Sequence, residues 1–93
     1  MKNKPVIALN RIGLISLDLK KNSKLEKLFV NNNSLEILNL SKCKKIKHIE
    51  CSGNPIKKII LFEGCTPTIV CDSQYVIEYK LSLFTSLIKS IKK

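Results

Sequence analysis

A regular spacing of leucine and isoleucine dominates the chain. From Leu25 to Cys51 the apolar residues follow the pattern Leu-x-x-Leu-x-Leu-x-x-Asn/Cys, and successive copies begin alternately ten and eleven residues apart. Self-similarity at a short fixed period is typical of repeat architectures, in which each unit buries its apolar face against its neighbours. The 93 residues are therefore expected to form a single domain, residues 1–93, built by stacking similar turns.

Two copies of the pattern make one turn of about 21 residues, which predicts repeats at residues 4–24, 25–45 and 46–65. The Leu-x-Leu part has the two-residue period of a strand, so both apolar side chains point to the same side. Each turn thus predicts two short strands, and the stacked turns predict two parallel sheets facing each other across a narrow core. Ten or eleven residues per half leave no room for an outer helix. The predicted fold class is a mostly-β solenoid.

The pattern decays after Cys65, and residues 66–93 allow two interpretations. A degenerate fourth turn can be traced through seven positions: Thr66, Ile69, Cys71, Gln74, Val76, Tyr79 and Leu81. Alternatively, Asp72 or Ser73 caps a helix from about Gln74 to Ser90, whose apolar residues recur every three or four positions. We expect a strand over residues 68–71 followed by a helical cap, because an uncovered solenoid end leaves unpaired strand edges.

Asn33 and Asn54 occupy the same place in successive turns. A tight bend leaves backbone groups that would be buried without a partner, and an asparagine amide offers both a donor and an acceptor to satisfy them. We therefore predict that these two residues form a structural ladder inside the bends and do not contact a ligand.

The four cysteines are separated by eight, fourteen and six positions: Cys43, Cys51, Cys65 and Cys71. A zinc site usually brings together two close Cys pairs, which this spacing lacks. The cysteines mostly fall in inward slots of the pattern, which predicts buried free thiols. A disulfide between Cys51 and Cys71 is the next possibility, although a side-by-side parallel pair is not readily bridged.

No constellation of residues indicates catalysis. His48 is the only histidine, and Glu50 is its one evident partner, without a nucleophile motif to complete an acid–base arrangement. The three glycines are too few to assemble a phosphate-binding loop. The sequence therefore predicts a protein that is not an enzyme and that uses neither a metal nor a cofactor.

Outward positions one turn apart should form ladders on the two sheets. One predicted ladder contains Ala8, Phe29, Glu50 and Val70, and the other contains Asp18, Asn39, Ile60 and Lys80. An aromatic residue exposed on a rigid sheet is a candidate contact residue, because aromatics are enriched in binding hot spots. The predicted partner-binding surface surrounds Phe29 and consists of Lys27, Phe29, Asn31, His48, Glu50 and Ser52.

Phrases such as Leu35-Glu-Ile-Leu-Asn-Leu-Ser-Lys-Cys43 and Ile49-Glu-Cys-Ser-Gly-Asn54 resemble the leucine-rich-repeat superfamily. Within it, the chain is similar to the short bacterial-type subclass, in which about 21 residues hold two nested halves. Residues 67–72 and 76–80 are similar to the C-terminal ends of some such proteins. The resemblance implies a non-catalytic scaffold for protein–protein interaction, often found in cell-surface or host-contact proteins.

Charge supplies an alternative function, since 17 basic residues face seven acidic ones and give a net charge of +10. Such a surface could bind nucleic acid or another anionic surface, and a third possibility is a structural fragment of a larger repeat protein. Asn10 and Arg11 interrupt the first apolar run, so we predict no signal peptide and no transmembrane segment. The expected location is cytoplasmic, or surface or secreted for a piece of a longer protein. Self-association through the solenoid ends is also possible.

Overall fold

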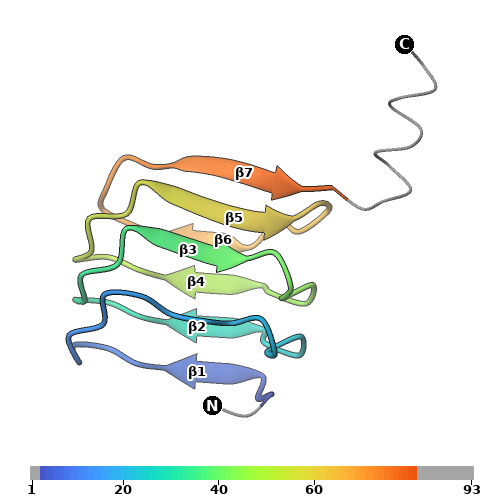
Figure 1. Cartoon of the computed structure of the whole chain (residues 1–93), viewed down its shortest axis with the longest axis horizontal. Coiled ribbons are helices and arrows are strands. Elements are labelled where there is room, and N and C mark those ends of the chain that lie inside the picture. The colour runs from blue at the N-terminus through green and yellow to red at the C-terminus, as the bar shows by residue number, and fades with distance from the viewer. Residues whose placement is uncertain (1–2, 82–93) are drawn as a thin grey trace.

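The computed structural model describes residues 3–81, which wind into a β-solenoid of about four turns (Figure 1). No helix occurs within these residues, and the predicted mostly-β solenoid is confirmed. The strands of this part of the chain are β1 (Val6–Ala8), β2 (Lys27–Phe29), β3 (Ile37–Leu40), β4 (His48–Glu50), β5 (Lys58–Phe62), β6 (Thr68–Val70) and β7 (Val76–Lys80).

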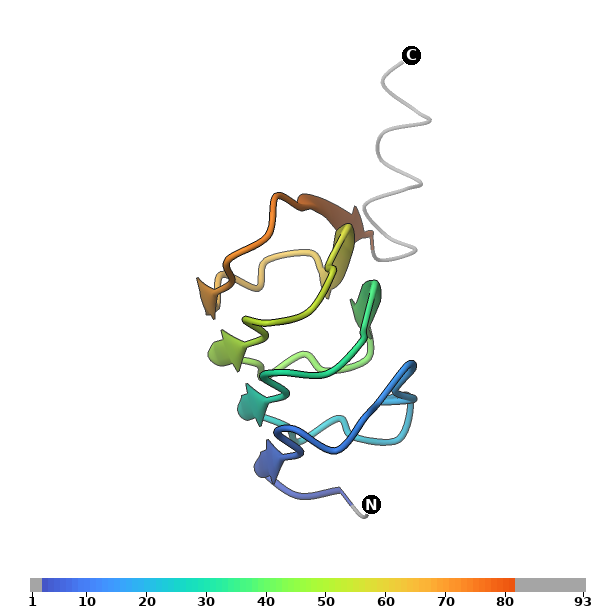
Figure 2. The same cartoon turned by 90° about the vertical axis from the view of Figure 1, so that its left-hand side faces the viewer.

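The strands form two parallel sheets that lie on opposite sides of the stack (Figure 2). The four-stranded sheet has the order β1-β2-β4-β6, and the three-stranded sheet has the order β3-β5-β7. Residues 21 apart face each other in the first turns, as in the pairs Ile7–Leu28 and Leu28–Ile49. The second half of the first turn forms no strand in the described chain, so the prediction of two strands in every turn is wrong there. Asp18, expected on the second ladder, lies in that segment.

The core lies between the sheets and consists of the inward residues of the repeat pattern. Leu28, Leu38, Ile49 and Ile59 are at most 1 % exposed, whereas the residues beside them in each strand are half-buried or exposed. Complete burial of a Leu or Ile side chain contributes roughly 1.5–3 kcal/mol. The alternation along each strand therefore fixes the register, because a slip by one residue would bring the polar set inside.

A buried asparagine ties each bend to the turn before it. Asn33 Oδ1 accepts hydrogen bonds from the backbone N–H groups of Ile12 and Leu14, both at 3.0 Å. Its Nδ2 donates to the carbonyl oxygens of Leu9 at 2.8 Å and Val30 at 3.0 Å. Asn54 makes the equivalents of three of these four bonds one turn later, with the Leu35 N–H and the carbonyl oxygens of Val30 and Cys51. These backbone groups would otherwise be left without partners inside the bend.

The residue just before Asn33, Asn54 and the equivalent Ile12 of the first turn has a left-handed backbone conformation. Arg11, Asn32 and Gly53 have φ values of 52°, 60° and 71°. Asparagine and glycine tolerate this conformation best. Gly53 has a second reason to be glycine, since a Cβ at this position would collide with the Asn32 side chain.

The expected helix from Gln74 is wrong over the described residues, because Val76–Lys80 forms strand β7. In β7, Ile77 lies opposite Ile59 and Tyr79 opposite Leu61, so this segment completes a fourth turn. The β-branched pair Val76-Ile77 suits a strand, and pairing along β5 satisfies backbone groups that a helix would have to satisfy internally. Residues 82–93, where the expected helix continues, lie outside the described part.

The loop between β6 and β7 is shorter than its counterparts, with residues 71–75 in place of a segment such as 51–57. The offset between paired residues, which is 20 between β4 and β6, therefore falls to 18 between β5 and β7, and Glu78 lies opposite Ile60. The predicted ladder from Ile60 to Lys80 is therefore wrong, and Lys80 lies opposite Phe62.

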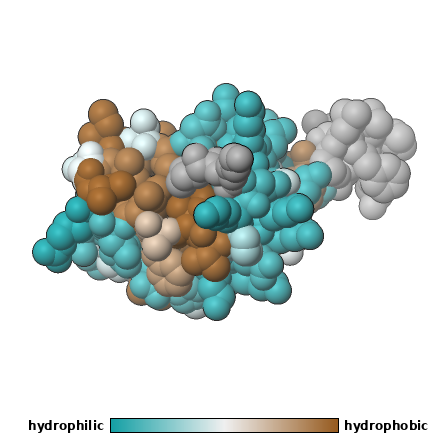
Figure 3. Space-filling model, turned by 90° about the horizontal axis from the view of Figure 1, so that it is seen from below, coloured by the Kyte–Doolittle hydropathy of each residue, from teal (hydrophilic) through white to brown (hydrophobic). Residues whose placement is uncertain are grey.

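The N-terminal end of the stack exposes apolar side chains, which appear as the brown area in Figure 3. Ile12 is 57 % exposed and Ile15 is 78 % exposed, while Leu9, Leu14 and Leu17 are half-buried. Ile12 stands where the next two turns carry Asn33 and Asn54, so it offers no amide to a further turn below. This surface is thus built as an end of the asparagine-linked stack.

All four cysteines are free thiols, and Cys43, Cys51 and Cys65 are buried while Cys71 is half-buried. Burial, together with the neighbouring Cys65, raises the pKa of Cys43 to about 11. Burial and the neighbouring Cys71 raise the pKa of Cys51 to about 12. Because the thiolate is the reactive form, both groups combine poor access with a very low reactive fraction.

We predict that Cys43 and Cys51 react slowly with a thiol reagent in the native protein and fast in denaturant. At pH 8 a thiol of pKa about 11 is ionised in roughly one molecule per thousand, against about one in ten for a pKa of 9.0. Single-cysteine proteins, each with its other cysteines changed to serine or alanine, should therefore label at least ~100-fold faster in urea. A chelator should leave the melting temperature unchanged. Fast native labelling of Cys43 would contradict its inward position.

Candidate functional site

The outer face of the four-stranded sheet is the candidate site. In each of its strands the middle residue points into the core, and the two flanking residues point outward. Parallel pairing places the outward residues in two rows across the sheet. The rows consist of Val6, Lys27, His48 and Thr68, and of Ala8, Phe29, Glu50 and Val70.

An ionisable pair lies at the centre of this face, on strand β4. His48 Nε2 is 2.9 Å from Glu50 Oε2, and both side chains are about one-third exposed. The His48 ring also contacts the Phe29 ring from β2, with centroids 5.6 Å apart and planes tilted by 47°. Such an offset contact of aromatic rings is favourable beyond its burial of surface. The three side chains therefore hold one another in place across two adjacent strands.

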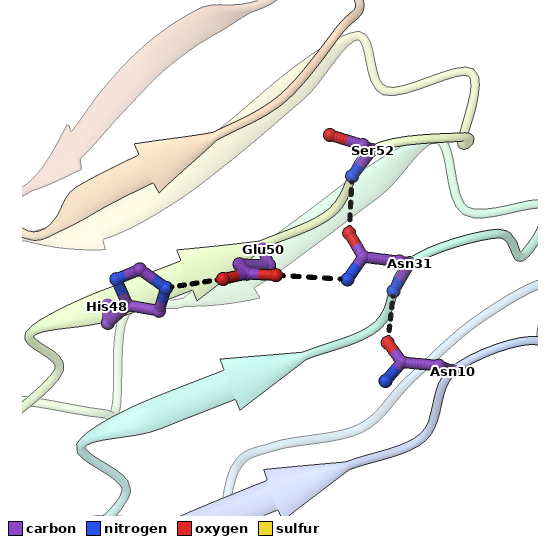
Figure 4. Close-up of polar contacts among 5 residues, drawn as sticks. All are labelled: Asn10, Asn31, His48, Glu50 and Ser52. Atoms are coloured by element: carbon purple, nitrogen blue, oxygen red, sulfur yellow. Dashed lines mark hydrogen bonds and ion pairs between the residues drawn. The ribbon is translucent and has the colours of Figure 1, made fainter.

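Asn31, just after β2, connects this pair to the bend that follows β4 (Figure 4). Its Nδ2 donates to Glu50 Oε1 at 3.2 Å, and its Oδ1 accepts from the Ser52 backbone N–H at 2.9 Å. The two carboxylate oxygens of Glu50 thus have different partners, His48 on one side and Asn31 on the other. The hydrogen bond with His48, and after it the one with Asn31, lowers the pKa of Glu50 below its usual value, although burial opposes the shift.

Asn10 supports the network from the turn below. Its Oδ1 accepts from the Asn31 backbone N–H at 2.7 Å, just as Asn31 does for Ser52. One turn further on, Asp72 Oδ1 accepts from the Gly53 backbone N–H at 3.0 Å. Sequence reasoning missed Asn10 and Asp72. The 21-residue spacing of Asn10 and Asn31 was an available signal, because equal spacing placed Asn33 and Asn54 in a ladder.

The structure brings four of the predicted residues, Phe29, Asn31, His48 and Glu50, into one connected cluster. Ser52 joins the cluster through its backbone N–H. Lys27 is exposed beside His48 in the register of the sheet. Because the Asn31 amide already serves its neighbours, the groups left for a partner are the Phe29 ring, the His48 and Glu50 polar atoms and the Lys27 ammonium.

The outer face of the three-stranded sheet also carries exposed apolar side chains. Ile37 is 53 % exposed and Val76 is 61 % exposed. Lys58 lies between them in the register of the sheet, and Ile60, two residues further along β5, is half-buried. Lys58 and Glu78 are 4.0 Å apart across β5 and β7, at the limit of an ion pair. In contrast to the first face, no hydrogen-bonded network among side chains holds the outward residues of this face within residues 3–81.

Neither face gathers metal ligands in the described part of the chain, where no three His, Cys, Asp or Glu side chains lie close enough to hold an ion. Within the same residues, no helix has the length and apolar character needed to span a membrane.

Comparison with known proteins identifies no relative: no protein-family model matches the chain, and no curated protein or solved structure matches it significantly.

Proposed function

We propose that this chain is a non-catalytic protein-interaction module of the leucine-rich-repeat type, similar to the short bacterial-type repeats. The observation that supports this proposal best is the cross-turn cluster on the outer face of the four-stranded sheet. There Phe29, His48 and Glu50 are held by one another and by Asn31 before any partner arrives. A surface ordered in advance loses little conformational entropy on binding, which favours affinity.

The chemistry of the cluster suits a partner with an apolar group flanked by a hydrogen-bond donor or a cation. The Phe29 ring would supply the central apolar contact, which is the usual place of an aromatic hot spot. The Glu50 carboxylate would accept from the donor or pair with the cation. The Lys27 ammonium, opposite His48 on the neighbouring strand, would fix the orientation of the partner through its opposite charge.

The contact area on one sheet is small. Four strands at ~4.8 Å spacing span about 15 Å, and a stable interface usually buries ~800 Å² on each partner. We therefore propose that a single module binds weakly and that several copies acting together bind firmly.

A comparison of two double variants tests the site. Phe29→Ala with Glu50→Lys changes the proposed face, and Ile37→Ser with Lys58→Glu changes the opposite face. Each protein is immobilised at high density, which supplies multivalency, and is exposed to extract from the source cells. We expect proteins retained by the unmodified chain to fall about tenfold or more on the first variant and to stay unchanged on the second.

Melting curves must first show that both variants are folded. Retention that falls only with the second variant would place the site on the three-stranded sheet. Retention that falls with neither variant would overturn the proposal that an outer sheet face binds protein.

A further inference from the structure

The lysines of this chain are concentrated on one edge of the solenoid. The bends at residues 20–24 and 41–45, which lead from the second half of a turn into the four-stranded sheet, form what we name the lysine edge. These ten residues include six lysines and no acidic residue: Lys20, Lys21, Lys24, Lys42, Lys44 and Lys45. The opposite bends of the same two turns, residues 10–15 and 31–36, carry only Arg11 and Glu36 and have no net charge. If the basic residues were spread evenly over the surface, both edges would carry a similar charge.

The local fold points these lysines outward and stacks them. Asn22 and Cys43 occupy the inward slot of the two bends and are buried. Both bends have the same hydrogen bonds, Asn22 N–H to Leu19 O at 3.0 Å and Cys43 N–H to Leu40 O at 2.9 Å. Equivalent residues are thus 21 apart, and the backbones of successive turns lie ~4.8 Å from each other. Lys21 therefore lies under Lys42, and Lys24 under Lys45. In the third turn, the position equivalent to Lys21 and Lys42 is occupied by Glu63.

Four of the six lysines have no acidic partner among the described residues. Lys20 Nζ lies 4.0 Å from Asp18 Oδ2, and Lys44 Nζ lies 4.8 Å from the centre of the Phe62 ring. Among residues 3–81, no carboxylate lies within ion-pair distance of the other four: Lys21, Lys24, Lys42 and Lys45. All four are exposed. Like charges gathered on one surface repel each other, so the arrangement is unfavourable unless an anion joins it.

We propose that the lysine edge binds the phosphate backbone of duplex nucleic acid. The charge density decides between polyanions. Duplex DNA carries one negative charge per ~1.7 Å of its axis. An extended acidic peptide offers one side chain per ~6.6 Å on the face it presents. Six ammonium groups on two adjacent bends match the denser partner.

Two other ligands fit the edge less well. Firm attachment to an anionic membrane takes an apolar or lipid anchor beside the basic residues. Within residues 3–81 the large exposed apolar side chains all lie outside these two bends. Single-stranded nucleic acid is held by aromatic stacking, and Phe62, the aromatic beside the edge, has Lys44 against its ring. Lysines without an arginine fork contact phosphate as point charges, so we expect no sequence preference.

Salt dependence of binding to a labelled 20-base-pair duplex, followed by fluorescence anisotropy, tests the proposal. With four to six phosphates neutralised, a log–log plot of affinity against salt should have a slope of about −4 to −5. Affinity should therefore fall about 300- to 1,000-fold between 50 and 200 mM salt. Changing Lys21, Lys24, Lys42 and Lys45 to serine together should make the slope shallower, at about −1. Its melting temperature should stay equal or rise, because the stacked charges are gone.

A charge-matched variant separates location from net charge. Arg11→Asn, Lys57→Ser, Lys58→Ser and Lys80→Ser together remove the same four charges away from the edge and should keep the steep slope. Equal losses in the two variants would show that net charge alone binds DNA and would overturn the proposal. Tighter binding to anionic phospholipid vesicles or to polyglutamate than to the duplex would overturn it in favour of those partners. Neither variant alters Phe29, His48 or Glu50, so this proposal and the protein-binding proposal can fail separately.

Discussion

Replacing Asn54 with alanine is expected to destabilise the fold by roughly 3–5 kcal/mol. The side chain satisfies backbone groups that no water reaches: it accepts from the Leu35 N–H at 3.0 Å and donates to Cys51 O at 3.1 Å. Each buried group left without a partner costs about 1–3 kcal/mol. Its third contact, to Val30 O at 2.8 Å, is shared with Asn33 and would be partly kept. Urea denaturation followed by circular dichroism measures the loss.

Two further substitutions make this measurement specific. Asn54→Asp keeps the acceptor but loses the donor and brings a charge into a buried site, so we expect it to be at least as harmful as alanine. Asn39→Ala is the matched control, because Asn39 is exposed and bonds only locally with Ser41. It should change stability by less than about 0.5 kcal/mol. An Asn54→Ala protein as stable as Asn39→Ala would contradict the structural role of the buried amide.

Leu38→Ala should destabilise the domain by about 2–5 kcal/mol, which is a large part of the ~5–15 kcal/mol available to a typical domain. Leu38 is 1 % exposed and lies opposite Ile59 in the three-stranded sheet. Its removal leaves a cavity between stacked turns, where the neighbouring backbones are hydrogen-bonded and cannot close the gap easily. The midpoint of urea denaturation reports the change.

Ile37 gives this prediction its control within the same strand. Ile37 points outward and is 53 % exposed, so Ile37→Ala should cost less than about 0.5 kcal/mol. Because the two positions are adjacent in one strand, comparing the two variants shows directly which side of the strand faces the core. A larger effect at Ile37 than at Leu38 would mean that the strand presents its other side to the core.

The inward frame could be predicted because a single property sets it. In a strand the side chains alternate, so the spacing of Leu38 and Leu40 determines that both point inward, and the structure buries both. The strand over residues 68–71 was predictable for the same reason and appears as Thr68–Val70. Repetition strengthens such inferences, since one frame must serve every turn.

The strand at residues 76–80 could not be predicted with the same assurance. Its apolar residues fit both a helical face and a degenerate turn, so the local pattern leaves the choice open. The open edge of β5 decides it, because pairing there satisfies the backbone of β7 along its length. That edge exists only in the folded stack. The shortened loop of residues 71–75 then shifts the register, which moves Lys80 away from its expected neighbour Ile60.

The candidate site was predictable as a set of outward residues but not as a network. Alternation places Phe29, His48 and Glu50 on one face. The orientation of the Asn31 amide toward Glu50, and the hydrogen bond from its backbone N–H to Asn10, depend on side-chain torsions and on the bend. The sequence pattern does not encode these. Asn31, which the sequence predicts as a contact residue, also hydrogen-bonds Glu50 and so helps to hold the other proposed contact residues in place.

The buried asparagines also give the stack a direction. Asn33 completes the bend of the first turn, and Asn54 completes that of the second, so each turn depends on residues about 20 positions further along the chain. A ribosome delivers the N-terminal end first. The first bend would therefore stay open until Asn33 has left the exit tunnel, and every later bend would close one turn behind synthesis. Nascent chains arrested with Asn54 still inside the tunnel and chains arrested after Asn54 has emerged should differ in the order of the second bend, and during synthesis the newest turn is always the one still unfinished.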